Sequence, residues 1–267
     1  MESALTLSTA GVDFHARQQG DNPGAVFIHG FGGDLHTWDL LWAELGGALP
    51  ALRYDLRGYG SSGGGEDESF SHVDDLLAIL DAQAIGQCDL VGVSMGGGIA
   101  LHTALEHPDR VRSLTLISPA LMGWEWSPPW RQRWRAIVEL AGAGEMDAAR
   151  RLWWSHPLFD SVRESSVSER VYGEVMAFAG TQWLHDPQRP VLPDVERLYQ
   201  LATPTLLLSG GRDEADFRLI ADLIEASADV VRRIDEPDLG HLLHIEDPAG
   251  CACRLRDFLG ERSAGAV

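Results

Sequence analysis

Short apolar runs and stretches of helical periodicity alternate along most of the chain. Six runs are mainly apolar, as is typical of parallel strands buried on both faces, and they lie at 25–29, 51–55, 88–93, 113–118, 204–210 and 229–235. Apolar residues recur at helical spacing between these runs, near 36–48, 69–85, 95–107, 216–227 and 247–259. Strands that alternate with helices predict a parallel sheet with crossover connections and helices on both faces.

The first twenty residues follow a different pattern. Residues 5–20, LTLSTAGVDFHARQQG, alternate between apolar and polar positions around a turn-like Thr-Ala-Gly, which predicts an antiparallel hairpin. The predicted fold class is therefore α/β, with a mostly parallel central sheet and an antiparallel N-terminal hairpin.

The rhythm of strands and helices stops between Ser118 and Thr203. This stretch has helical patterns, joined at Pro128, Pro157, Pro187 and Pro193, and no strand-like run. We interpret residues 119–203 as a helical cap inserted into a core made of 1–118 and 204–267.

Seven of the nine tryptophans lie in this predicted cap. They either form the cap's own small core or offer flat apolar walls to a substrate. The tryptophans expected to line a pocket are Trp124, Trp126, Trp153, Trp154 and Trp183.

Charge and cysteine usage restrict the partners and the compartment. The chain has 21 basic and 40 acidic residues, a formal charge of −19, which argues against nucleic acid or an anionic membrane as partner. The expected partner is therefore a small-molecule substrate, and the sequence does not indicate the oligomeric state. Because no stretch is long and uncharged enough to cross a bilayer and the start does not resemble a signal peptide, we expect a cytoplasmic protein.

The three cysteines, Cys88, Cys251 and Cys253, fit reduced thiols rather than a disulfide framework. They also lack the spacing of a zinc site, so we expect neither a metal nor another cofactor.

Residues 90–97, LVGVSMGG, place Ser94 between a predicted buried strand and a predicted helix. A Gly-x-Ser-x-Gly pattern is weak by itself, but this context is that of a strained elbow that exposes a nucleophilic serine. Gly92 and Gly96 would let the strand and the helix pass close together.

A serine nucleophile needs a base and a carboxylate that orients the base. Asp213 and His241 each lie in a loop after a later strand, and the ends of parallel strands meet at one edge of a sheet. Glu214 and Asp216 are alternatives for the carboxylate, and His244 is an alternative for the base. The backbone N–H groups of Phe31, in the glycine-rich HGFGG, and of Met95 are the expected oxyanion donors. His29, Asp55 and Arg57 are expected to shape loops beneath the site.

Five stretches together resemble the α/β-hydrolase family in order and spacing: HGFGGDLHTW, YDLRGYGSS, LVGVSMGGGIALHTALEHPDRV, LSGGRDEAD and LGHLLHIEDP. The resemblance implies Ser94 as nucleophile, His241 as general base and acid, Asp213 as the orienting carboxylate, and Phe31 and Met95 as oxyanion donors. It does not extend to the predicted cap.

Relatives of this fold that cleave haloalkanes or epoxides carry aspartate at the elbow, whereas a serine there implies an acyl-enzyme. We therefore expect a serine hydrolase that acts on a small, largely apolar carboxylic ester or lactone. The alternatives are a C–C bond hydrolase of a diketone-type substrate, a cofactor-free perhydrolase, and a ligand-binding protein without turnover. Arginines of the cap either bind a substrate carboxylate or form a solvated helix face; they are Arg131, Arg133, Arg135, Arg150 and Arg151.

Overall fold

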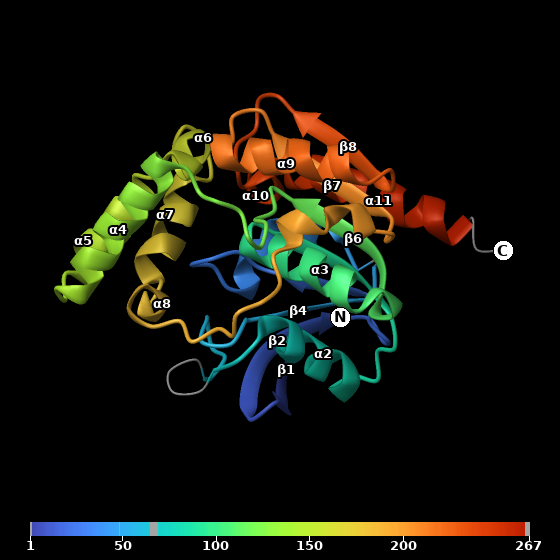
Figure 1. Cartoon of the computed structure of the whole chain (residues 1–267). Helices are drawn as coiled ribbons and strands as arrows, with labels where there is room; N and C mark the ends of the chain where they lie inside the picture. Colours follow the sequence, from blue (N-terminus) through green and yellow to red (C-terminus); the bar gives the residue numbers. More distant parts are fainter. Residues whose placement is uncertain (1, 48, 65–68, 265–267) are drawn as a thin grey trace.

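The computed structural model describes residues 2–47, 49–64 and 69–264. An eight-stranded sheet in the order β1-β2-β4-β3-β5-β6-β7-β8 forms its centre (Figure 1). The strands are β1 (Glu2–Thr9), β2 (Val12–Gln19), β3 (Ala25–Ile28), β4 (Ala51–Tyr54), β5 (Cys88–Val93), β6 (Val111–Ile117), β7 (Thr205–Gly210) and β8 (Val231–Glu236). The pairs β1–β2 and β2–β4 are antiparallel and the other pairs are parallel, which confirms the predicted mixed α/β sheet.

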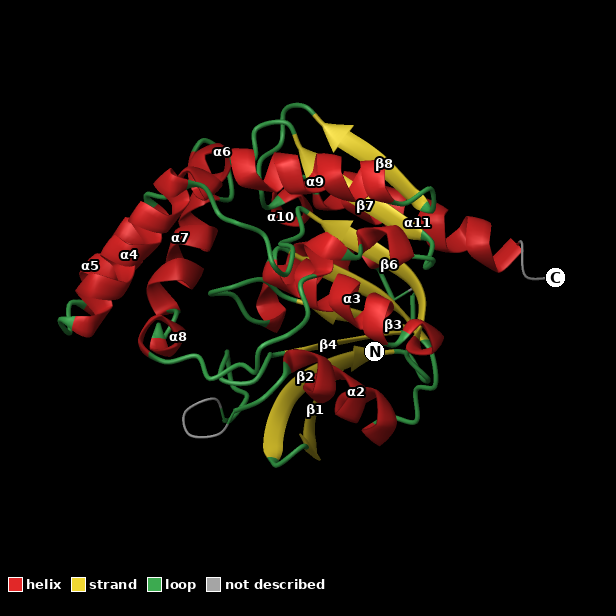
Figure 2. Cartoon of the chain, in the orientation of Figure 1, coloured by secondary structure: helices red, strands yellow, loops and turns green. Residues whose placement is uncertain are grey.

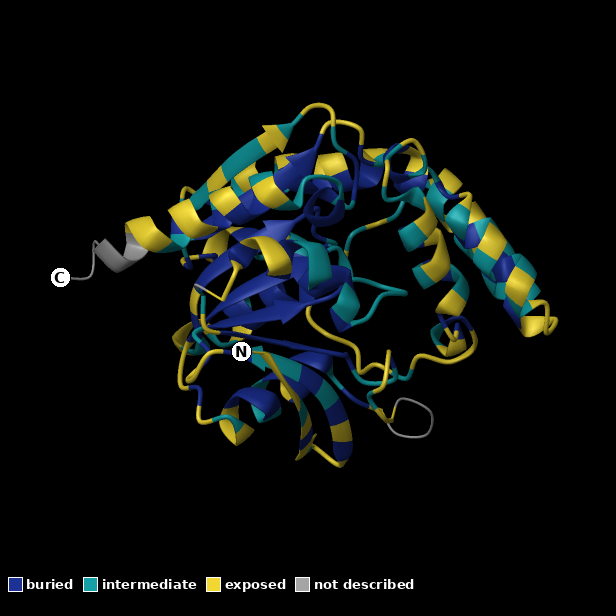
Figure 3. Cartoon of the chain, turned by 180° about the vertical axis from the view of Figure 1, so that it is seen from behind, coloured by how far each residue is buried: buried dark blue, intermediate teal, exposed yellow. Residues whose placement is uncertain are grey.

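Helices cover both faces of the sheet. They are α1 (Asp39–Leu45), α2 (His72–Ala82), α3 (Met95–Glu106), α9 (Ala215–Ser227), α10 (Leu243–Glu246) and α11 (Pro248–Ala264), with short 3₁₀ turns such as η1 (Leu35–Trp38). Successive residues of β3 point to opposite faces: Phe27 belongs to the buried cluster that includes residues of α1 and α11, and Ile28 belongs to the one that includes residues of α2, α3 and α9. In Figure 3 the central strands β3 to β7 are accordingly dark, since both of their faces are buried, whereas β1, β2 and the edge strand β8 also carry exposed and intermediate residues.

Element boundaries differ slightly from the sequence prediction. The helix expected near 36–48 is divided into η1 and α1, and α1 ends at Leu45 and is capped by Gly46, which has a left-handed φ of 61°. The strand expected from 229 begins at Val231, because the Val231 N–H closes a turn onto the Ala228 carbonyl.

Between β6 and β7 the chain forms a run of helices: α4 (Pro128–Gly142), α5 (Met146–Trp154), α6 (Asp160–Arg163), α7 (Ser168–Ala177) and α8 (Thr181–Leu184). We call residues 119–203 the helical insertion. Figure 2 shows α4, α5 and α7 beyond the carboxyl edge of the parallel strands, to which the yellow arrows point. The division into a core and a cap at these boundaries stays a prediction.

The helix α3 passes very close to the sheet. A Cβ atom added to Gly92 would lie 2.3 Å from the Gly96 carbonyl oxygen, and one added to Gly96 would lie 2.2 Å from the Ile28 carbonyl oxygen. Both obstacles are backbone atoms, which cannot turn aside as a side chain can. Glycine at these two positions therefore allows the sharp turn from β5 into α3.

We expect Gly96→Ala to lower the free energy of unfolding by at least ~2 kcal/mol, because the added methyl group must displace the β3 backbone. Gly173→Ala is the control: Gly173 lies inside the helix α7 with no atom within 4 Å of an added Cβ. This second change should raise stability by ~0.5–1 kcal/mol. Urea denaturation measures the free energy of unfolding of both variants. A change of the same sign in both would contradict the packing argument.

Candidate active site

Ser94 lies at the turn between β5 and α3 in a backbone conformation that side chains resist, with φ 53° and ψ −120°. Hydrogen bonds hold this conformation on both sides. The Ser94 N–H donates to the Ile117 carbonyl at 3.0 Å, and the Ser94 carbonyl accepts from the N–H groups of Gly98 and Ala120. The predicted elbow is therefore present in the geometry, with the Ser94 side chain only partly buried.

Asp213 and His241 form a buried pair. His241 Nδ1 lies 3.0 Å from each carboxylate oxygen of Asp213, and His241 is 1% exposed. Because a carboxylate only accepts, Nδ1 carries the proton and the lone pair of Nε2 is directed elsewhere. The ring of Phe217 covers the imidazole at a centroid distance of 4.3 Å.

Ser94 and His241 line the same cavity but are not hydrogen-bonded to each other. Nε2 of His241 is buried and has no hydrogen-bond partner among the described residues. In ligand-free enzymes such contacts are often long and shorten when substrate binds. The geometry thus pairs His241 with Asp213 and leaves His241 without a hydrogen bond to Ser94.

The alternative carboxylates are engaged elsewhere. Asp216 accepts hydrogen bonds from the Trp124 indole and from the Ser127 N–H, at 3.2 Å each. Glu214 accepts from the Asp216 N–H at the start of α9. Neither contacts His241, so position favours Asp213.

The alternative base, His244, lies behind the site. Its Nε2 is 3.2 Å from the Thr37 hydroxyl, and its ring packs on Trp38 at 4.7 Å. Burial, with a smaller effect of nearby His241, lowers the pKa of His244 to about 3. A base needs a pKa closer to neutrality, so His244 is poorly suited to the role.

The glycine-rich loop after β3 lies against the elbow. A Cβ added to Gly30 would be 3.2 Å from Ser94 Cβ and 3.8 Å from its hydroxyl oxygen. Phe31 and Met95 border the cavity. Within the described residues, neither of their backbone N–H groups donates a hydrogen bond, so both are available to an oxyanion.

Two buried polar groups shape this loop. His29 Nε2 accepts from the Leu56 N–H at 3.0 Å, so its Nδ1–H donates to the Gly30 carbonyl at 2.8 Å. The Asp55 carboxylate accepts from the N–H groups of Leu35 and Ser61. Arg57 pairs with Asp75 at 2.5 Å.

A cavity of about 630 Å³ lies between the elbow and the helical insertion. Its lining is mainly apolar or aromatic, and Ser94, His241 and Thr37 are polar members of it. The aromatic members are Phe31, Trp126, Trp130, Trp134, Trp153, Phe159 and Phe217. Such a surface suits a substrate with an apolar body.

The prediction of which tryptophans line the cavity needs correction. Trp126 and Trp153 do, but Trp124 is tied to Asp216, and Trp154 packs outside the cavity against Phe159 and Tyr172. Trp183 is buried against Phe31 and Phe178.

Two lining tryptophans, Trp130 and Trp134, were not among those expected. They are four residues apart on α4, the spacing that puts side chains on one side of a helix, and Trp126 lies just before that helix. That spacing was the available signal.

Three charged residues line the cavity: Arg131, Arg135 and Glu174. Arg131 pairs only with the exposed Glu125, at 3.3 Å, and Arg135 has no ion pair among the described residues. The other arginines considered from the sequence do not line the cavity; they are Arg133, Arg150 and Arg151.

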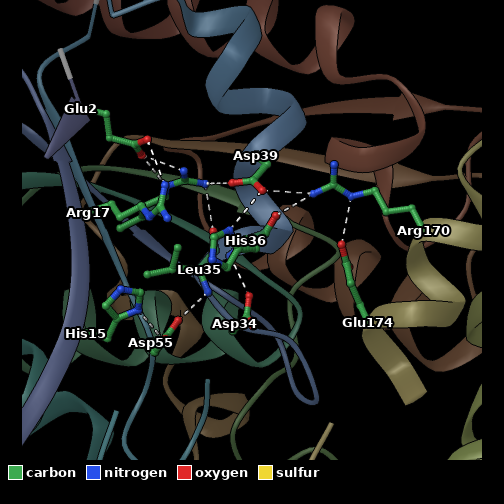
Figure 4. A network of polar contacts seen from close by, with 11 residues as sticks. Glu2, His15, Arg17, Asp34, Leu35, His36, Asp39, Asp55, Arg170 and Glu174 are labelled. Atoms are coloured by element: carbon green, nitrogen blue, oxygen red, sulfur yellow. Dashed lines mark hydrogen bonds and ion pairs between the residues drawn. The ribbon is translucent and has the colours of Figure 1, made fainter. Parts of the chain in front are cut away.

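Glu174 belongs to a chain of ion pairs that connects the insertion with the sheet (Figure 4). Arg170 Nε donates to Glu174 at 2.9 Å, and its Nη2 reaches the His36 carbonyl at 3.1 Å and Asp39 at 3.4 Å. Asp39 in turn pairs with the buried Arg53 at 2.6 Å. Burial raises the pKa of Glu174. Its charge is thus engaged with Arg170, whereas Arg131 and Arg135 leave positive charge at the cavity.

A family model for the alpha/beta hydrolase fold matches residues 26–248. The chain belongs to the α/β-hydrolase fold family. Helices long and apolar enough to span a membrane, and groups of three or more residues able to hold a metal ion, are both absent from the described part of this hydrolase-family chain.

Three members of the family are similar along most of the chain. A 2-succinyl-6-hydroxy-2,4-cyclohexadiene-1-carboxylate synthase from Salmonella typhimurium is 29% identical, over 92% of this chain and 97% of its own. A 2-hydroxymuconate semialdehyde hydrolase from a Pseudomonas species is 26% identical, over 100% and 97%. 3-Oxoadipate enol-lactonase 1 from Acinetobacter baylyi is 27% identical, over 85% and 84%.

A second histidine near the site, His156, also has a pKa of about 3, mainly through burial and then through Arg133 and His241. Its folded-state pKa lies below the ordinary 6.5, so the unfolded chain takes up the proton first as the pH falls. His156 therefore stabilises the fold above pH 6.5, and this contribution is lost between 6.5 and about 3. Its Nδ1 accepts from the Leu158 N–H, an interaction that asparagine can replace.

Between pH 6 and pH 4 the free energy of unfolding of the wild type should fall as the pH falls. In His156→Asn we expect this fall to be smaller, by up to ~1.4 kcal/mol per pH unit. Urea denaturation at several pH values measures this slope, which does not depend on the stability lost from packing. Equal slopes in the variant and the wild type would contradict the neutral, buried state of His156.

Proposed function

We propose that this protein is a serine hydrolase that cleaves a small, largely apolar carboxylic ester or lactone through an acyl-enzyme. The observation that carries the proposal is the buried Asp213–His241 pair, whose unpartnered Nε2 belongs to the same cavity as the Ser94 elbow. A base, its orienting carboxylate and an accessible alcohol are what acyl transfer requires.

In the proposed reaction the Ser94 oxygen attacks the substrate carbonyl while His241 Nε2 takes the serine proton. The negative charge on the former carbonyl oxygen is met by the N–H groups of Phe31 and Met95. His241 then gives the proton to the leaving oxygen, and an acyl group remains on Ser94. Water, activated by the same imidazole, releases the acid and restores the serine.

We expect Ser94→Ala to abolish hydrolysis of a short-chain p-nitrophenyl ester and to prevent labelling by a fluorophosphonate. Asp213→Asn should reduce kcat by roughly 10⁴-fold, since the amide disfavours the productive histidine tautomer. Asp216→Asn, a matched change in the alternative carboxylate, should keep kcat within about tenfold of the wild type. Mass spectrometry of the Ser94 peptide locates the label. Turnover by Ser94→Ala would refute the assignment, and equal losses in the two aspartate variants would refute the role of Asp213.

The charges at the cavity suggest that the substrate also bears a carboxylate. Arg131 and Arg135 stand one turn apart on α4, beside an otherwise apolar surface. In a chain of net charge −19, two weakly paired arginines are an unusual feature of a binding site. An ester or lactone with an acidic group at one end would place its charge there and its carbonyl at Ser94.

We expect Arg135→Gln to raise KM for an ester with a free carboxylate about tenfold, the usual loss for one charge-assisted contact, and to leave KM for the matching neutral ester unchanged. Arg133→Gln, on the same helix but outside the cavity, is the control. Steady-state kinetics with both esters separate the effects. A parallel rise for the neutral ester would argue against recognition of the carboxylate.

A C–C bond hydrolase is the second candidate. It is favoured by the similarity to a 2-hydroxymuconate semialdehyde hydrolase over the whole chain. Assay of a dienoic diketone beside the esters distinguishes the two reactions. A third candidate, a ligand-binding protein without turnover, would bind these compounds without reacting with the fluorophosphonate.

A further inference from the structure

The loop that carries His241 is fastened by the carboxylate of Glu246. The Gly240 N–H, in the residue directly before His241, lies 3.2 Å from each carboxylate oxygen of Glu246. Glu246 ends the short helix α10, which follows the loop. The peptide that leads into the histidine is therefore anchored to a charged acceptor, and such a hydrogen bond is stronger than one between neutral groups.

The helical insertion holds Glu246 in turn. Ser161 in α6 is 5% exposed, and its hydroxyl donates to Glu246 Oε2. A Cβ added to Gly240 would lie 2.5 Å from Ser161 Cβ, so the insertion also abuts the backbone beside His241. One buried hydroxyl thus connects the insertion, the Glu246 carboxylate and the catalytic loop.

A neighbouring contact provides a comparison. Glu164, three residues after Ser161, pairs with Arg212, which directly precedes Asp213. The side chains of this pair are 68% and 43% exposed, and exposed ion pairs contribute little. We expect the buried contact at Glu246, not this bridge, to fix the position of the insertion relative to the site.

His241 needs such a constraint. Its ring is held at Nδ1 by Asp213, yet Nε2 has no partner, so the approach to Ser94 depends on how the backbone presents the imidazole. The main chain beside the imidazole is held by the hydrogen bond from the Gly240 N–H to the Glu246 carboxylate. A small rotation there changes the direction of Nε2 while the Asp213 contact is kept.

We propose that Glu246, held by Ser161, is a positioning residue that sets the imidazole of His241 relative to Ser94 and makes this setting depend on the seating of the helical insertion. The proposal rests on the proposed function, in which His241 is the base. Glu246 itself touches neither the substrate nor the reacting atoms.

The test compares Glu246→Ala, Glu246→Gln, Ser161→Ala and the control Glu164→Gln in the full chain. Glu246→Ala should lower kcat and the rate of fluorophosphonate labelling about 10- to 100-fold, as expected for the loss of one hydrogen bond to a charged group, with KM unchanged. Glu246→Gln keeps an oxygen for the Gly240 N–H and should retain most of the activity. Ser161→Ala should fall between them, and Glu164→Gln should resemble the wild type.

The double variant Ser161→Ala/Glu246→Ala should be no slower than Glu246→Ala alone, because the two residues act as a unit. Hydrogen exchange of the peptide 238–246 reports on the contact without any substrate. Exchange at Gly240 should accelerate in both alanine variants and not in Glu164→Gln.

The proposal is overturned if Glu246→Ala keeps the wild-type kcat and labelling rate, if Gln does not rescue, or if exchange at Gly240 is unchanged. If Glu246 has only a structural role, Glu246→Ala should lower the thermal stability and raise KM together with the fall in kcat. This result would also overturn the proposal. A wild type that is not labelled at Ser94 would instead refute the proposed function, and the positioning role with it.

Discussion

The parallel alignment of the strands is the constraint on which the site depends. Ser94, Asp213 and His241 follow β5, β7 and β8, and only a sheet whose carboxyl ends share one edge brings such distant parts of the chain together. The close approach of α3 to β3 and β5 makes the turn at Ser94 sharp, so that the Ser94 side chain projects from it. Since this approach tolerates no Cβ at Gly92 or Gly96, the position of Ser94 and the packing of the core are set by the same contacts.

The helical insertion supplies much of the aromatic lining of the cavity at the carboxyl edge of this sheet. Its aromatic side chains enclose the cavity, so the Asp213–His241 pair is removed from bulk water, where electrostatic interactions are weaker. The chain of ion pairs from Arg53 to Glu174 fastens one wall of the cavity to the sheet. Ser161 and Glu246 connect the insertion with the loop that carries His241. The insertion is thus part of the site's geometry as well as its cover.

Buried histidines surround the proposed base without sharing its environment. Burial keeps His244 and His156 neutral, whereas His241 has a carboxylate at Nδ1. Three histidines within one region therefore differ in what they can do, and the difference comes from their partners rather than from their residue type.

Much of this protein follows from local features of its sequence. The apolar runs, the helical spacing and the glycines around Ser94 predict the α/β sheet and the elbow, because each depends on neighbours in the chain. The order of Ser94, Asp213 and His241 was likewise readable, since it reflects which strand each residue follows.

The tertiary structure alone decided the rest. Whether Trp153 or Trp154 faces the cavity, and whether Arg135 or Arg133 does, depends on the rotation of a helix against distant partners, which adjacent letters do not encode. Ser161 carries no motif at all. Its contact with Glu246 joins residues 85 positions apart and arises only when the insertion packs on the completed sheet.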